Sequence, residues 1–137
     1  MSKLLDNSTD IPVELAMHLI QSSGKEDARL IRQGRLLSTT VMLRIGDDEW
    51  RMVIQAGKVT ALQPGPFVMP SCQLLIGAPA AEWQLFWRPV PPPGSHDLFA
   101  LLKRGVLTLD GDLHPFMSHL FYFKQLLAAA RLREATV

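Results

Sequence analysis

The sequence predicts an α/β domain with five strands and three or four helices. Two patterns predict this class. Residues 37–62 alternate apolar and polar side chains as a half-buried sheet does, whereas apolar residues in segments before and after them recur every three or four positions, as in amphipathic helices. The chain has 137 residues, about the length of one domain, and a chain of this length can bury its own core without disulfides.

Charge and cysteine content exclude several protein classes. The net charge is +1, which gives no basic field for binding nucleic acid, so no nucleic-acid partner is expected. The only cysteine, Cys72, leaves no intrachain disulfide and favours a reducing, cytoplasmic compartment. No apolar stretch approaches the ~18 residues of a membrane-spanning helix, and residues 1–10 lack the pattern of a secretory signal.

The amino-terminal part is predicted to contain one clear helix. Residues 1–10 are polar, and we expect them to be disordered. Pro12 suits a first helical turn, and the apolar spacing that follows predicts a helix from residue 13 to about residue 21. A polar link at residues 22–27 comes next, and residues 11–35 together are interpreted as a helical extension before the main domain.

Four strands are predicted in the middle of the chain. Alternating residues 37–45 and 50–56 form two strands joined by a tight turn, and a third strand follows at residues 59–62. The fourth strand, residues 72–76, has apolar side chains on both faces, which indicates that it lies inside the sheet rather than at an edge.

The second half mixes helices with one strand. Trp83, Phe86 and Trp87 share one face of a helix that begins at Pro79 and ends before Pro89. The proline tract 89–94 forms neither helix nor ladder and is predicted to be a stiff connector. The remaining predicted elements are a helix capped by Ser95 and ended by Gly105, a strand at residues 106–110, and a helix from Leu113 to about Arg133.

The last predicted helix is more apolar than a surface helix needs to be. An amphipathic helix buries a stripe a little over ~100° wide, but here apolar side chains occupy most of the circumference. Other helices, a second subunit, or an apolar ligand lying between helix and sheet could each cover the surplus. The polar strip that remains consists of His114, Ser118, Tyr122 and Gln125, and the apolar positions are Leu113, Phe116, Met117, Leu120, Phe121, Phe123, Leu126 and Leu127.

Catalytic and metal-binding patterns were sought, and none is convincing. Ser95, His96 and Asp97 are adjacent, so their side chains point in different directions and cannot form a hydrolase triad. His114 and His119 are five residues apart, unlike the four-residue spacing of zinc-binding pairs on a helix. We therefore expect no catalytic residue, no metal site and no cofactor.

The segment from residue 96 to residue 113 resembles the sterol carrier protein 2 family. Its most specific part is Gly105-x-Leu107-x-Leu109-x-Gly111-Asp112-Leu113, and the resemblance extends from about residue 36 to residue 132. It implies that residues 36–133 form a lipid-binding domain with a mixed, largely antiparallel five-stranded sheet, helices on one face, and an apolar cavity between sheet and helices. Gly105, Gly111 and Asp112 carry over as structural turn and cap positions.

The leading hypothesis is noncatalytic binding and transfer of a lipid or another hydrophobic small molecule: a sterol, a fatty acyl chain or an isoprenoid quinone-like compound. Tyr122, His119 or Ser118 would orient the ligand near the cavity mouth, and contact with a membrane or an enzyme would be transient. Periodicity predicts that the cavity is lined by Trp50, Met52, Ile54, Leu74, Ile76, Trp83, Phe86, Trp87, Phe99, Leu102, Phe116, Met117, Leu120 and Phe121.

Two alternatives from other functional classes remain open at this point. The surplus apolar surface could instead meet another chain, either in a homodimer or docked on a partner enzyme. A small enzyme acting on a lipid-like substrate, with His96, His114 or His119 as the base, is the second alternative.

Overall fold

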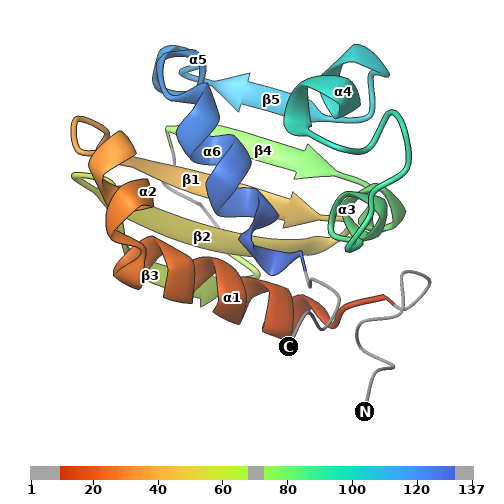
Figure 1. The fold of residues 1–137 in the computed structure, drawn as a ribbon, viewed down its shortest axis with the longest axis horizontal. Helices are drawn as coiled ribbons and strands as arrows, with labels where there is room; N and C mark the ends of the chain where they lie inside the picture. The colour runs from red at the N-terminus through yellow and green to blue at the C-terminus, as the bar shows by residue number, and fades with distance from the viewer. Residues whose placement is uncertain (1–9, 68–72, 132–137) are drawn as a thin grey trace.

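The computed structural model describes residues 10–67 and 73–131, which form one five-stranded sheet with helices on one face (Figure 1). The strand order is β3-β2-β1-β4-β5, with β1 parallel to β4 and all other neighbours antiparallel. The predicted mixed, largely antiparallel sheet is therefore confirmed, and β4 lies inside it as expected. The strands are β1 Thr39–Ile45, β2 Asp48–Gln55, β3 Lys58–Pro64, β4 Leu74–Ala78 and β5 Thr108–Gly111.

The helices lie before β1, between β4 and β5, and after β5 in the chain. Figure 1 shows α1, α2 and α6 in front of the sheet, whereas α4 and α5 lie at the two ends of β5. A single 3₁₀ turn, Ala128–Ala130, follows α6. The helices are α1 Val13–Glu26, α2 Ala28–Gln33, α3 Ala80–Phe86, α4 Leu98–Lys103, α5 His114–Ser118 and α6 Leu120–Leu127.

The first helix is longer than its sequence pattern predicts. The polar link expected at residues 22–27 is helical as far as Glu26, and Asp27 caps α2 by accepting hydrogen bonds from Arg29 N and Leu30 N. Gly24 fits inside α1 because the helix packs closely on β3: a Cβ at this position would clash with the Val59 side chain. The expected disorder at residues 1–10 falls almost wholly outside the described residues.

The last predicted helix is in fact two. His119 has φ −125° and ψ 40° and ends α5, so the continuous helix expected from residue 113 is wrong, and its end beyond residue 131 lies outside the described residues. The two helices bury unequal sets of side chains: α5 buries Phe116, and α6 buries Tyr122, Phe123, Leu126 and Leu127. The apolar residues of this segment are thereby divided between the interior and the surface.

Tyr122 joins three elements at one point. Its hydroxyl donates a hydrogen bond of 2.7 Å to Gly57 O in the β2–β3 turn, and burial raises the pKa of this phenol. A Cβ on Gly34, just after α2, would lie 2.6 Å from the tyrosine ring. The sequence pattern had placed Tyr122 on the polar strip, but a ring with one polar atom is stable inside when that atom finds a backbone partner.

Replacing Tyr122 with Phe should lower the free energy of unfolding by about 1–2 kcal/mol, because Gly57 O would be buried without its donor. The raised pKa means that this tyrosine's contribution is complete below its unfolded pKa of about 10 and declines as the pH rises above that value. Urea denaturation at about pH 8 and about pH 10.5 should therefore show a smaller alkaline loss in the variant than in the wild type. Equal stability of the two proteins at both pH values would contradict this interpretation.

Candidate functional site

An apolar layer fills the space between the inner face of the sheet and the helices. Alternate strand residues such as Val41, Leu43 and Met52 point into it from the sheet, and aromatic rings enter it from α3, α5 and α6. Most of the residues predicted to line a cavity meet in this layer. Those that are buried together are Met52, Ile54, Leu74, Ile76, Trp83, Phe86, Trp87 and Phe116, and those partly buried at its margin are Trp50, Leu102 and Leu120.

Three predicted lining residues do not join this layer. Phe121 is 70% exposed, Met117 51% and Phe99 43%. Met117 and Phe121 lie on the side of α5 and α6 away from Phe116 and Phe123, whose rings face the layer. Phe99 lies one position after Leu98, whose side chain takes the buried position on α4.

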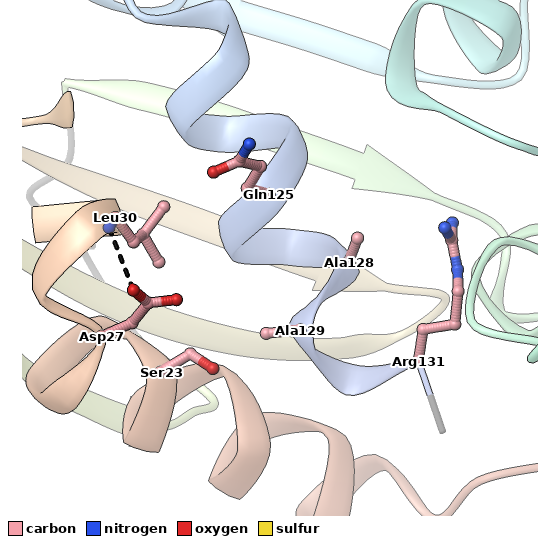
Figure 2. Close-up of a pocket in the computed structure, with 7 residues that line it drawn as sticks. All are labelled: Ser23, Asp27, Leu30, Gln125, Ala128, Ala129 and Arg131. Atoms are coloured by element: carbon pink, nitrogen blue, oxygen red, sulfur yellow. Dashed lines mark hydrogen bonds between the residues drawn. The ribbon is translucent and has the colours of Figure 1, made fainter. Parts of the chain in front are cut away.

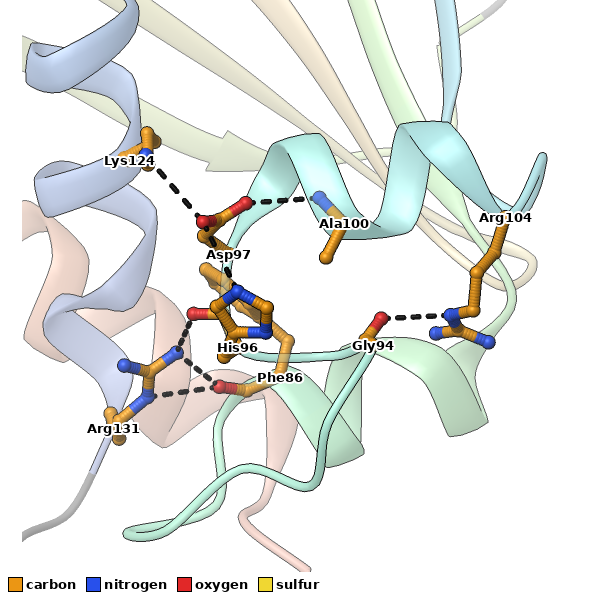
Figure 3. Close-up of polar contacts among 8 residues, drawn as sticks. All are labelled: Phe86, Gly94, His96, Asp97, Ala100, Arg104, Lys124 and Arg131. Carbon is orange, nitrogen blue, oxygen red and sulfur yellow. Dashed lines mark hydrogen bonds and ion pairs between the residues drawn. The ribbon is translucent and has the colours of Figure 1, made fainter.

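One end of the apolar layer is fixed by hydrogen bonds. The indole nitrogen of Trp83 donates to Arg44 O at 2.9 Å, and that of Trp87 donates to Leu127 O at 3.0 Å. The two indole rings are stacked with centroids 5.3 Å apart. Arg131 donates from two nitrogens to Phe86 O and lies over the Phe86 ring (Figure 3). Because their indole nitrogens are hydrogen-bonded, the rings of Trp83 and Trp87 have little freedom to move aside.

At the other end of the layer the hydrogen-bonded ring is that of Tyr122, which packs on Phe123, while Phe116 and Phe123 themselves have no such anchor. Phe116 and Phe123 lie ring against ring with centroids 5.3 Å apart, and neither ring has a polar atom that could tie it to the backbone. Phe116 is also the only buried side chain of α5. Around this pair the cover is thin, because three leucines from different elements are only partly buried: Leu102 of α4, Leu109 of β5 and Leu120 of α6. This end is therefore where the layer can be parted most easily.

Surface hollows differ in character between the two sides of α6. The one drawn in Figure 2 has a volume of about 420 Å³, lies between α1, α2 and the end of α6, and is lined largely by polar groups including Ser23, Asp27 and Gln125. A second hollow, of about 520 Å³, lies on α4, where Phe99, Ala100 and Leu102 give it an apolar floor. Since Leu102 also packs on the buried layer, the α4 hollow borders that layer.

Asp97 links α4 to α6 beside this hollow (Figure 3). Its carboxylate accepts a hydrogen bond from Ala100 N at 2.9 Å and lies 3.6 Å from Lys124 Nζ and 3.6 Å from His96 Nε2. Burial acts to raise the pKa of Asp97, but the Ala100 hydrogen bond, the Lys124 and His96 charges and the Phe99 amide together hold it below its usual value. The carboxylate is thus kept ionised, and it serves as both helix cap and cross-link.

The polar side chains do not assemble a hydrolase triad. Ser95 Oγ accepts a hydrogen bond of 3.1 Å from Arg104. His114 Nε2 lies 3.4 Å from Ser118 Oγ, and His119 Nδ1 lies 3.3 Å from Pro115 O. Within residues 10–67 and 73–131, no three potential metal-ligating side chains are grouped together.

The predicted motif positions have structural roles at the β5 end. Gly105 and Gly111 have φ of +77° and +95°, and a Cβ on Gly111 would lie 2.5 Å from Gln73 O. Asp112 accepts a hydrogen bond of 3.2 Å from His114 N at the start of α5.

Nothing in the part of the chain that the structure describes forms a helix long and apolar enough to cross a bilayer.

Comparison with solved structures identifies the fold. The crystal structure of sterol carrier protein 2 superposes with a TM-score of 0.68 at 15% identity, covering 85% of this chain and 93% of the other. The chain has the sterol carrier protein 2 fold. A conserved hypothetical protein from Thermus thermophilus gives a TM-score of 0.61 at 12% identity, with 92% of this chain and 91% of that chain covered.

The palmitated SCP2L2 protein of Aedes aegypti also shares this fold. Its TM-score is 0.56 at 16% identity, covering 90% of this chain and 98% of that chain. No family model matches the sequence, and no curated protein matches it either. At these identities of 12–16%, the comparisons establish likeness of fold.

The cavity lining predicted from the sequence omits several residues of the apolar layer, among them Leu109, Tyr122 and Phe123. Leu109 faces inward on β5 and pairs with Ile76. The alternation in residues 106–110 predicts the strand and also indicates this inward position. Phe123 and Tyr122 pack edge to face with centroids 5.6 Å apart. Phe123 follows Phe116 by seven residues and so shares its face, a spacing that the sequence offers as a signal.

Asp97→Asn should keep the helix cap but lose the attraction to Lys124 and His96, lowering the free energy of unfolding by about 0.5–1 kcal/mol near neutral pH. The lowered pKa of Asp97 means that this stabilisation is present above the carboxyl's unfolded pKa of about 4 and is lost as the pH falls through its lower folded value.

Chemical denaturation of both proteins between about pH 7 and pH 2.5 measures this effect. The difference in stability between wild type and Asp97→Asn should shrink as the solution becomes acidic. A difference that stays constant over the whole range would show that the cross-link contributes nothing through its charge.

Proposed function

We propose that this protein binds the apolar chain of a lipid, without catalysis, between the inner face of the sheet and helices α5 and α6, and transfers it. The observation that carries the proposal is the asymmetry of the apolar layer. Its α3 end is fastened by indole and guanidinium hydrogen bonds, whereas its β5 end rests on Phe116 and Phe123, which have none.

The comparison structures support a carrier role. They share the arrangement of sheet and helices over most of their length, and the Aedes aegypti protein is described in its palmitated form. A single saturated chain is also the ligand whose shape best suits a narrow space between a sheet and two short helices. We therefore propose a fatty acyl chain as the ligand class, ahead of a rigid sterol ring system.

In this proposal the ligand makes its own space. A chain entering between α4, β5 and α6 first meets the partly buried leucines Leu102, Leu109 and Leu120. It then displaces the Phe116 ring from Phe123, which requires α5 to move, and α5 has only that one buried side chain to hold it. Trp83 and Trp87 form the closed far end, and Leu74 and Ile76 of β4 form the floor.

The energetics of such an exchange are balanced enough to allow release. Burying ten methylene groups stabilises the complex by about 8 kcal/mol, and exposing one phenylalanine ring costs about 2–3 kcal/mol before the cost of association. The remainder of about 5–6 kcal/mol corresponds to a dissociation constant of about 0.1 mM. A carrier needs this order of affinity, because a ligand held far more tightly would not be passed on.

The α4 hollow offers a partner for a polar head. Lys103 lines it next to the apolar floor, so a carboxylate head would stay in water beside this ammonium group while the chain lies inside. Tyr122 is not available for this orienting role, since its hydroxyl is engaged by Gly57 O. With one cysteine in 137 residues, we place this activity in the cytoplasm.

The proposal is tested by ligand uptake in solution. Protein purified without detergent and stripped of lipid is titrated with a fluorescent palmitate analogue, and native mass spectrometry measures the stoichiometry. We expect saturable binding of one chain per protein, displaced by unlabelled palmitate. Absence of saturable uptake by folded protein would refute a carrier role.

Adjacent residues of β5 provide a matched pair of variants. Leu109→Asp places a carboxylate on the inner face at the proposed entrance and should weaken binding of the palmitate analogue at least about tenfold, because a charge would have to be desolvated against the chain. Thr108→Asp places the same charge one residue away on the opposite, exposed face and should leave affinity within about twofold.

Both variants are compared by urea denaturation so that affinity is measured on folded protein. Equal affinities of Leu109→Asp, Thr108→Asp and wild type would show that the ligand does not enter at β5.

A further inference from the structure

The outer side of α5 and α6 carries a ridge of exposed apolar side chains, formed by Leu113, Met117 and Phe121. Phe121 and Met117 are 70% and 51% exposed, and both line one surface hollow of about 500 Å³. Large apolar side chains gathered in one place on a surface mark an interaction site more often than single exposed residues do. None of the described residues covers this ridge, which lies on the side of α5 and α6 away from the buried Phe116 and Phe123.

Helix α2 brings positive charge to the same surface. Gln33 of α2 lines the hollow together with Met117 and Phe121, and Arg29 lies one helical turn from Gln33 on the same side of α2. Arg29, Arg32 and Arg35 are exposed, and residues 28–36 include no acidic side chain. Among the described residues, no carboxylate forms an ion pair with these three arginines.

The exposed Asp110 and Asp112 lie directly before Leu113 at the β5 end of the ridge and accept backbone hydrogen bonds, whereas the acidic groups on its α4 and α2 sides are engaged. Asp97 is paired with Lys124, whose Nζ lies 5.4 Å from the centroid of the Phe121 ring, and Asp27 caps α2. The ridge is thus bordered on the α2 side by arginines that no carboxylate of the described residues pairs with, on the α4 side by a balanced pair, and on the β5 side by two aspartates.

We propose that the ridge and the α2 arginines dock the protein on an anionic phospholipid bilayer. Apolar side chains at the acyl boundary together with arginines at the headgroup phosphates are the combination that holds peripheral proteins at such surfaces. A second copy of this chain fits the surface less well. A two-fold contact would place the patch against itself, so arginines would face arginines.

Docking here has a consequence that rests on the proposed function. The ridge belongs to the same two helices that cover the loosely held end of the apolar layer, Phe116 on α5 and Leu120 on α6. A protein seated on a bilayer by this ridge would hold that end next to the membrane, so an acyl chain could pass between bilayer and protein with little exposure to water.

Vesicle co-sedimentation tests the docking directly. Wild-type protein is mixed with vesicles of phosphatidylcholine alone or with about 30% phosphatidylglycerol, at about 0.1 M and about 1 M salt. We expect binding to the anionic vesicles, at least tenfold weaker binding to neutral ones, and loss of most binding at high salt. Wild-type protein that does not bind anionic vesicles, or binds both compositions equally, would overturn the proposal.

Two matched pairs of variants locate the surface. Phe121→Ser should lower the partition coefficient on anionic vesicles about tenfold, whereas Val90→Ser, at a residue 66% exposed on the proline-rich loop, should leave it unchanged. Arg32→Gln should lower it about fivefold, whereas Arg44→Gln, on the face of the sheet opposite the helices, should lower it less than twofold. Equal effects within each pair would overturn the assignment of this surface.

Two further readouts separate the possible failures. Uptake of the fluorescent palmitate analogue in vesicle-free solution should be normal in Phe121→Ser, because this side chain lies outside the layer. Vesicle binding without palmitate uptake by the wild type would leave the docking surface standing and refute the carrier role. A wild-type dimer that Phe121→Ser converts to a monomer, without vesicle binding, would instead make the ridge an interface between copies and overturn membrane docking.

Discussion

The inner face of the sheet must be covered, and this constraint organises the molecule. Strands β1, β2 and β4 present apolar side chains to that face, from Val41 and Leu43 to Met52 and Ile76. Helices from both ends of the chain close over it, α1 and α2 from the beginning and α6 from the end (Figure 1). Hydrophobic burial stabilises this arrangement without regard to direction, so directional contacts decide which parts of the cover are rigid and which can move.

Those directional contacts are unevenly distributed. Trp83, Trp87 and Tyr122 each donate a hydrogen bond to a backbone carbonyl from another element, which fixes α3 to β1, α3 to α6, and α6 to the β2–β3 turn. Phe116 and Phe123 contribute area but no direction. Fewer directional contacts around Phe116 than around α3 make this the place where the proposed acyl chain would enter.

Much of the fold was predictable because local patterns and the overall fold agree. Alternation predicted the strands, and β4 was placed inside the sheet because Leu74, Leu75 and Ile76 make it apolar on both faces. The glycines of the Gly105–Leu113 motif turn the chain as expected. The last helix was predicted as one because nothing at His119 marks a break, and Phe121 and Met117 were predicted inside. Tertiary packing decides which side chains of α5 and α6 are buried, and it has no local signature.

The central claim is that an acyl chain lies inside the apolar layer at its β5 end. Photolabelling with a palmitate analogue that carries a diazirine near the end of its chain, followed by peptide mapping, tests this most directly. The account predicts labels on buried residues of β4, α5 and α6, such as Ile76, Phe116 and Phe123, abolished by excess palmitate. Labels confined to the exposed side chains of Met117 and Phe121, or labels that excess palmitate does not diminish, would contradict it.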